Sequence, residues 1–289
     1  MKCSAAVLIA ALAGLVVARP SNDAERIKIR EEDNSRSVGR AEPFAKKSST
    51  NTLLDGVANS AIQASRVYWG HAWAGAVMNT PPSGHYRSVT GSFIVPNPQP
   101  IGHPRVKDKQ WAAITVGIDG VCNGGMVLAG IEFRYTLTGF FFNAWWEAWP
   151  YGMTTVDIAT FPVMPGDNIQ VEIIAPTTIT ATVKITNHSR GRVFSQDIVI
   201  QRKNALCREN ALFIVQDIMS YGQYTTLANF GTVNFFGIST RLSNGHFRDL
   251  TSPFTRWEIA VGPDDAPKCL TNTEIKDGKR LTISYAPQK

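Results

Sequence analysis

Hydrophobic and polar residues alternate with a period of two from about residue 70 onward. The pattern is clearest over residues 178–186, where apolar residues alternate with threonines and one lysine. The apolar positions are Ile179, Ala181, Val183 and Ile185. Because successive side chains of a strand point to opposite faces, this segment predicts a strand with one buried and one solvated face. Turn-forming sequences precede it at 165–168 and follow it at 187–191.

Short runs rich in β-forming residues recur along the rest of the chain, separated by turn-like sequence. They are residues 113–118, 126–135, 140–149, 169–175, 193–200, 211–218, 230–236, 256–261 and 280–285. No convincing amphipathic helix lies between these runs. Many short strands at turn-punctuated intervals predict an all-β fold, an antiparallel sandwich or barrel. We expect one domain over residues 66–289.

The first 65 residues differ from this pattern. Residues 1–18 combine Lys2, an apolar run and a small residue at Ala18, the layout of a secretory signal peptide cleaved after Ala18. Residues 19–65 carry a mixed-charge run and a Ser/Thr/Asn-rich stretch, typical of a propeptide or disordered arm. The apolar run is too short to span a bilayer. The sequence therefore predicts a secreted, extracellular protein that does not span the membrane.

Composition and cysteine content narrow the functional classes further. The formal net charge is +6, but Lys and Arg are dispersed along the chain, which argues against nucleic-acid binding. Removal of the signal peptide leaves Cys122, Cys207 and Cys269, so an oxidising compartment predicts one disulfide and one odd thiol. No Cys-x-x-Cys or His-x-x-x-His spacing occurs, so we expect neither a metal nor another cofactor. Asn187 begins a glycosylation sequon in an apparent hairpin turn.

Seven collinear blocks between residues 73 and 233 carry a family resemblance. They are Trp73-Ala-Gly-Ala76, Val89-Thr-Gly-Ser-Phe-Ile-Val-Pro96, Val116-Gly-Ile-Asp-Gly120, Ala129-Gly-Ile-Glu-Phe133, Ala144-Trp-Trp-Glu-Ala-Trp-Pro150, Asn210-Ala-Leu-Phe-Ile-Val-Gln-Asp217 and Ala228-Asn-Phe-Gly-Thr-Val233. In this order the blocks resemble the fungal glutamic peptidases, also called eqolisins. The resemblance implies a jelly-roll or concanavalin A-like sandwich of two antiparallel sheets, a cleft across one concave sheet, and acid endopeptidase chemistry.

In that family a glutamine and a glutamate together activate the attacking water. The glutamine position falls on Leu128, and the glutamate, the second of two in its block, falls on Gln216; the first glutamate falls on Leu212. Leucine offers no donor to an oxyanion, a loss that typically costs on the order of 10²–10³ in rate. Glutamine has no titratable proton, which removes a general acid–base contribution of roughly 10²–10⁴. The resemblance therefore predicts that both catalytic residues are replaced.

Other cleft positions of the family are better preserved. Asp119, Trp145 and Glu147 match its residues, Glu132 stands for an aspartate, and Trp149 replaces a tyrosine. Alternation would place Trp145, Glu147 and Trp149 on one face, where they form a ledge for an extended peptide or a sugar. The alternatives are core packing for the tryptophans and, for Asp119, a turn residue that binds its own backbone.

The resemblance also implies how the cysteines pair. Cys122 and Cys207 match family positions shortly before the two catalytic strands, which predicts a Cys122–Cys207 disulfide and an unpaired Cys269. Such a bridge would tie the beginnings of those two strands together.

Three functions follow from these observations. The first is a catalytically inactive peptidase homologue, a monomer whose cleft binds a peptide or an unfolded protein segment. The second is an active acid endopeptidase with its chemistry relocated to Glu132 and Glu147, since two close carboxylates can share a proton. The third is a lectin-like glycan binder, which rests on analogy of fold alone.

Overall fold

The computed structural model describes residues 36–37, 67–102, 110–122, 124–136, 138–262 and 268–287. Within these residues every regular element is a strand, except for one 3-10 turn, η1 (Arg202–Asn204). This confirms the predicted all-β class. No helix in the described part of the chain is long and apolar enough to cross a bilayer. The predicted signal peptide, and all of the predicted arm except residues 36–37, lie outside the described residues.

The larger of the two main sheets has ten strands, in the order β19-β18-β3-β12-β5-β6-β7-β8, with β15 beside β5 and β2 beside β18. All its pairs are antiparallel apart from β15 with β5 and β2 with β18. The strands are β2 (Val67–Gly70), β3 (Trp73–Met78), β5 (Gln110–Ile118), β6 (Val127–Thr136), β7 (Gly139–Ala148), β8 (Met153–Thr155), β12 (Ala211–Gln216), β15 (Thr226–Leu227), β18 (Phe254–Val261) and β19 (Lys268–Cys269).

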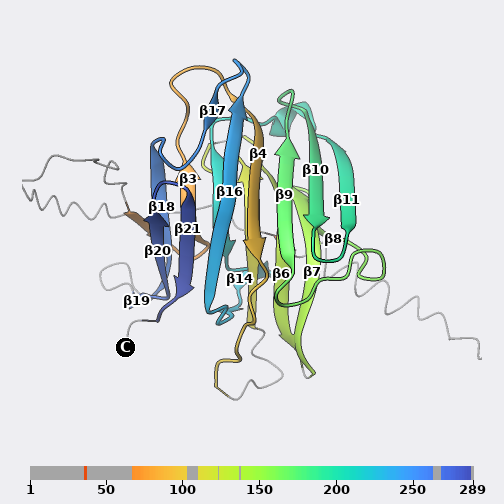
Figure 1. The fold of residues 1–289 in the computed structure, drawn as a ribbon, viewed down its shortest axis with the longest axis vertical. Coiled ribbons are helices and arrows are strands. Elements are labelled where there is room, and N and C mark those ends of the chain that lie inside the picture. Colours follow the sequence, from red (N-terminus) through yellow and green to blue (C-terminus); the bar gives the residue numbers. More distant parts are fainter. Residues whose placement is uncertain are drawn as a thin grey trace, which may run out of the picture.

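The second main sheet has eight strands, in the order β11-β10-β9-β4-β16-β21-β20, with β17 beside β16. Figure 1 looks onto this sheet, with strands of the larger sheet behind it. The strands are β4 (Tyr86–Ile94), β9 (Asn168–Ile174), β10 (Thr180–Asn187), β11 (Arg192–Val199), β16 (Thr232–Leu242), β17 (Phe247–Arg248), β20 (Thr271–Lys276) and β21 (Arg280–Tyr285). The fold is therefore the predicted two-sheet sandwich.

A third, small sheet contains β1 (Arg36–Ser37), β13 (Met219–Ser220) and β14 (Gln223–Tyr224). Strand β13 pairs on one side with β14 and on the other with β1, both antiparallel. A short piece of the predicted N-terminal arm thus lies beside the hairpin that follows β12.

The hydrophobic core fills the space between the two main sheets. Strand β10 shows why: Ala181, Val183 and Ile185 are buried in this core, whereas Lys184 is exposed on the opposite face. This confirms the predicted alternation. The core draws its largest side chains from both sheets, among them Phe93 and Phe235 of the smaller sheet and Phe133 and Phe213 of the larger one.

A buried carboxylate joins the two sheets at one end. Glu258 of β18 accepts hydrogen bonds from two residues of β20: the Thr271 hydroxyl at 2.8 Å and the Thr273 backbone N–H at 2.7 Å. The Thr273 hydroxyl donates a further bond at 3.2 Å. Because β18 and β20 belong to different sheets, this network fixes how the two sheets meet there.

The predicted glycosylation site does not fit the folded structure. Asn187 lies at the end of β10, as the turn prediction required, but it is completely buried. Its side-chain nitrogen donates to Asp167 Oδ2 at 2.8 Å and to the Pro162 carbonyl at 3.2 Å. A glycan would displace one of these hydrogen bonds and would need space that the fold has filled. The sequon is thus part of a buried polar network beneath the hairpin.

Candidate functional site

The ten-stranded sheet carries a second hydrophobic cluster on the face that points away from the main core. We call this the outer cluster. Its buried members are Ala72, Trp73, Val77, Trp111, Ala113, Met126, Leu128, Trp145, Met153, Leu212, Ile214, Ile218 and Trp257, with Tyr68 and Trp149 packed against it as half-buried members. Most residues that the sequence motifs single out therefore lie on one sheet face, although they come from distant parts of the chain.

The strand register shows which of these residues are neighbours. Leu128 of β6 lies opposite Gly117 of β5, and Gly117 lies opposite Leu212 of β12 on its other side. A Cβ atom added to Gly117 would overlap the Leu128 side chain and would lie only 3.1 Å from Leu212 Cδ1. The two leucine side chains therefore lie over Gly117 from its two sides. The centre of this face is apolar.

Gln216 lies elsewhere on the same face. It pairs with Ala113, four residues along β5 from Gly117, which corresponds to about 13 Å at the usual rise of a strand. Gln216 therefore does not lie beside Leu128, whereas Leu212 does. The expectation from the sequence that positions 128 and 216 form the pair gains no support from the register.

Buried polar atoms without a hydrogen-bond partner in the described structure gather on this face. Both amide atoms of Gln216 belong to this set, as does the hydroxyl of Thr115. Further members are the indole nitrogens of Trp73, Trp145 and Trp257. An unpaired buried donor or acceptor typically costs about 1–3 kcal/mol. Their concentration in one place indicates a face suited to a polar partner and not to plain core packing.

The carboxylates Glu132 and Glu147 lie on this face but not together. Glu132 pairs with Asn143 in the register, and its Oε1 accepts a hydrogen bond from Asn143 Nδ2 at 3.1 Å. Glu147 pairs with Leu128, four residues away along β6, or about 13 Å. Trp145 stands between the two carboxylates on β7. Two groups that share a proton lie about 3 Å apart, so this register does not form such a pair.

The predicted aromatic ledge is mostly covered. Trp145 and Glu147 have the shared orientation that alternation predicts, but both are fully buried. Trp149 follows the end of β7 and is half-buried against the outer cluster. The tryptophans thus contribute to packing.

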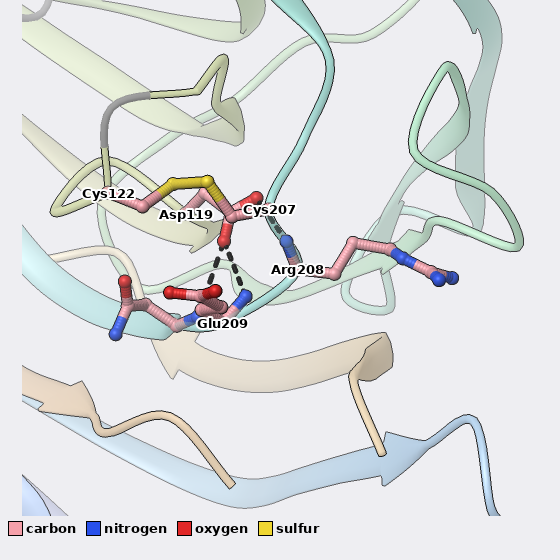
Figure 2. Close-up of a disulfide and its surroundings, with 6 residues drawn as sticks. Asp119, Cys122, Cys207, Arg208 and Glu209 are labelled. Atoms are coloured by element: carbon pink, nitrogen blue, oxygen red, sulfur yellow. Dashed lines mark hydrogen bonds between the residues drawn. A yellow bond between two sulfur atoms is a disulfide. The ribbon is translucent and has the colours of Figure 1, made fainter.

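Asp119 proves to be a structural residue next to the disulfide. Its carboxylate accepts hydrogen bonds from the backbone N–H groups of Arg208 and Glu209, both at 2.7 Å, and of Asn210 at 3.3 Å. Figure 2 shows the first two of these bonds beside the bridged cysteines. Burial raises the pKa of Asp119, and the three amides oppose that rise. Asp119 therefore has a structural role, as the hypothesis of a turn residue implied, and does not line the cleft. It binds the backbone of a distant segment, however, and not its own.

The disulfide itself is the predicted one. Cys122 and Cys207 are bonded, with their Cα atoms 6.6 Å apart, and Cys269 is free. In the described structure a group of potential metal ligands consists of Asp119 and these two bridged cysteines. Sulfur atoms that are bonded to each other are not thiolates, so this group does not make a metal site.

One buried acid was missed by the sequence analysis. Asp217 follows β12 directly, and its carboxylate accepts a hydrogen bond from the Thr225 hydroxyl at 3.0 Å across the β13–β14 hairpin. Burial raises the pKa of Asp217 to about 8, against the opposing hydrogen bonds. Its position at the end of a continuous apolar run was the available signal, but a run of that kind does not reveal what will cover its last residue.

The chain is similar in sequence to known proteins. Residues 71–285 match the Peptidase A4 family. Aspergillopepsin-2 from Aspergillus niger is 25% identical over 236 residues, which cover 74% of this chain and 77% of that protein. Scytalidopepsin B from Scytalidium lignicola is 25% identical over 146 residues, so the match spans about half of each protein, 50% and 51%.

Solved structures of glutamic peptidases have a similar fold. The crystal structure of scytalido-glutamic peptidase with a transition state analog inhibitor superposes with a TM-score of 0.63 at 20% identity, covering 75% of this chain and 98% of that one. Aspergilloglutamic peptidase from Aspergillus niger superposes with a TM-score of 0.54 at 24% identity, covering 61% of this chain and 99% of that one. Both likenesses concern the fold. On the match over residues 71–285, the chain belongs to the Peptidase A4 family, the glutamic peptidases.

Proposed function

We propose that this protein is a secreted, catalytically inactive member of the Peptidase A4 family that binds extended peptides at the outer face of its ten-stranded sheet. The observation that carries the proposal is that Leu128 and Leu212 both reach over Gly117, one from each side. Residues that act on one water molecule must lie side by side, and these two positions do. Neither leucine can donate a hydrogen bond or transfer a proton.

The same conclusion follows if the acid position is assigned to Gln216 instead. Glutamine does not titrate, so it cannot serve as the general base, and the partner at position 128 is still a leucine. The inactive state therefore does not depend on which of the two glutamates of the family motif is the catalytic one.

Relocated catalysis through Glu132 and Glu147 is the weaker candidate. Their register offset of four residues and the intervening Trp145 argue against a shared proton. Glycan binding is weaker still, because it rests on analogy of fold alone.

Peptide is the favoured ligand because of the polar atoms on this face. Indole N–H groups donate to carbonyl oxygens, and the Gln216 amide can both donate and accept, so together they match the alternating groups of a peptide backbone. One structure with the same fold, at a TM-score of 0.60 and 20% identity, is described as a complex of an eqolisin with the tripeptide Ala-Ile-His. Secretion is supported by the predicted signal peptide and by the disulfide, which forms in oxidising compartments.

The test is an incubation of the secreted protein with a reduced, alkylated protein substrate at pH values from 2 to 7. We expect no fragments above those of a heat-inactivated control when the products are separated by mass spectrometry. Efficient cleavage that disappears in Glu147→Gln would instead support the relocated site.

A pair of double variants serves as the matched control. Leu128→Gln with Leu212→Glu places an amide and a carboxyl group on the two sides of Gly117, whereas in Leu128→Gln with Gln216→Glu the two groups are offset by about 13 Å along the strands in addition to the same two strand spacings. We expect any restored cleavage at acid pH to arise in the first variant only, with circular dichroism used to verify that both variants fold.

A further inference from the structure

Arg134 lies at one end of the outer face, close to the hairpin that joins β6 and β7. The register places it between Trp111 of β5 and Phe141 of β7. Its Cζ atom lies 5.8 Å from the centroid of the Trp111 ring and 5.6 Å from that of Phe141. At such distances aromatic rings attract a cation. The two rings therefore hold the guanidinium in a defined position at the edge of the face.

This guanidinium has no acidic partner among the described residues. Glu132, two residues earlier on the same face, binds Asn143, and no ion pair joins it to Arg134 within the described structure. The Nε atom of Arg134 is buried and makes no hydrogen bond there. Leaving a charged donor buried and unpaired costs free energy, which a bound anion would recover.

A carboxylate is the anion that this site fits. The two oxygens of a carboxylate can each accept a hydrogen bond from the forked N–H donors of an arginine guanidinium. A lysine ammonium, which acts as a point charge, does not offer this paired arrangement of donors. The half-buried Arg134 can still be reached from solvent. The β6–β7 ladder ends two residues further on, at the pair Thr136 and Gly139, so a peptide that lies along β6 would run out of sheet near Arg134.

We infer that Arg134 is a specificity-determining residue that binds the C-terminal carboxylate of a peptide on the outer face. The inference rests on the proposed peptide-binding function and adds the class of peptide. Arg134 lies six residues along β6 from Leu128, roughly 20 Å, and an extended peptide of six residues spans that length.

The experiment compares three N-acetylated forms of the hexapeptide Ala-Ile-Thr-Val-Ser-Phe by titration calorimetry against the full chain. One form has a free C-terminal carboxylate, one is the C-terminal amide, and one is the amide with glutamate in place of serine. We expect the free acid to bind about ten-fold more tightly than the amide, as a charge-assisted bidentate contact requires. Arg134→Gln should lower the affinity for the acid to that for the amide and leave the amide unchanged, which a merely structural role would not do.

The matched control is Arg241→Gln. Arg241 of β16 lies 5.7 Å from the Phe247 ring on the eight-stranded sheet, so this variant removes the same kind of contact far from the outer face. It should retain the preference for the acid.

Tight binding of the glutamate-containing amide would support the carboxylate subsite and would show that a side chain can also supply the carboxylate. Equal affinities of all three peptides, or a preference that survives Arg134→Gln, would overturn the role of Arg134 while peptide binding stands. If no form binds, both this inference and the proposed function are wrong.

Discussion

At the residue scale, the proposed function depends on a few side chains on one face of the ten-stranded sheet. Leu128 and Leu212 fill the space over Gly117 with methyl groups, where a peptidase needs groups that transfer protons. Around them, polar atoms of Thr115 and Gln216 remain buried without hydrogen bonds in the described structure. Under the proposed function, leucines occupy the positions at which the catalytic residues would stand, and the polar groups around them serve binding.

Asp217 gives the first prediction at this scale. Its pKa in the folded protein is raised to about 8, from an ordinary value of 3.8, because burial penalises the charged form. The stabilisation from this group is therefore complete below about pH 4 and is lost as the pH rises toward 8, at about 1.4 kcal/mol per pH unit. Asp217→Asn cannot ionise, so it should weaken this dependence and gain stability relative to the natural protein between pH 4 and pH 7.

Urea unfolding at pH 4, 5.5 and 7 measures the effect. The control is Asp277→Asn, an exposed residue with φ +56°, a conformation that asparagine also adopts. It should leave the pH dependence unchanged. A difference in stability between Asp217→Asn and the natural protein that is the same at all three pH values would contradict the prediction.

At the scale of the elements, the disulfide and Asp119 together hold the beginnings of two central strands. Cys122 precedes β6 and Cys207 precedes β12, and Asp119 binds three backbone amides of the segment that leads into β12. Strand β5 lies between β6 and β12 in the sheet. The two strands that carry Leu128 and Leu212 are therefore fixed in position at the same end.

Removal of this bridge should destabilise the fold. The two cysteines are 85 residues apart, and closing a loop of that length restricts the unfolded chain by roughly 4–5 kcal/mol in the chain-entropy model. We expect the double variant Cys122→Ala, Cys207→Ala to lose about 2–5 kcal/mol in urea unfolding. Cys269→Ala, which removes the free thiol, should lose less than about 1 kcal/mol. Equal losses in the two variants would show that the bridge contributes nothing beyond side-chain packing.

At the scale of the whole molecule, the two sheets are held together by the apolar core and by one buried polar network. Glu258 reaches from the ten-stranded sheet to Thr271 and Thr273 of the eight-stranded sheet. Removing its carboxylate leaves the Thr271 hydroxyl and the Thr273 backbone N–H without their acceptor.

We therefore expect Glu258→Ala to lower the free energy of unfolding by about 1–3 kcal/mol, the usual cost of leaving a buried donor without its partner. The matched control is Glu274→Ala, on the partner strand β20. Glu274 is exposed and its ion pair with Lys276 is long, at 3.9 Å, so its loss should cost less than about 0.5 kcal/mol. Urea unfolding followed by circular dichroism compares the two. A loss below about 1 kcal/mol for Glu258→Ala would mean that the apolar core alone holds the sheets together.

The sequence by itself predicted most of the longer strands. The period-two pattern that predicted residues 178–186 became β10, and the predicted runs at 169–175 and 193–200 became β9 and β11 within one residue at each end. Alternation is a local property, because each side chain points to the opposite face from its neighbour whatever the partner strand is. The ordered motifs likewise determined the family and, through it, the disulfide.

Where local sequence signals are weak, the tertiary structure decided whether a segment forms a strand and whether a residue is buried. Trp73–Met78 is not among the predicted strands, because its alanines and glycine have low β-propensity. That segment is β3 because β12 and β18 pair with it on either side. The burial of Asn187 has the same origin: its partners Asp167 and Pro162 are 20 and 25 residues away, so the sequon alone could not reveal them.

The arrangement of the site also depended on tertiary structure alone. Alternation showed that Leu128 shares a sheet face with every second residue of β6. It did not show which residue of β12 would lie opposite Leu128 on that face. That neighbour is Leu212 and not Gln216, because the register of both strands against β5 aligns residues more than 80 positions apart. Register arises from the packing of the whole sheet, so the sequence determined the residues of this face, while the fold determined which of them act together.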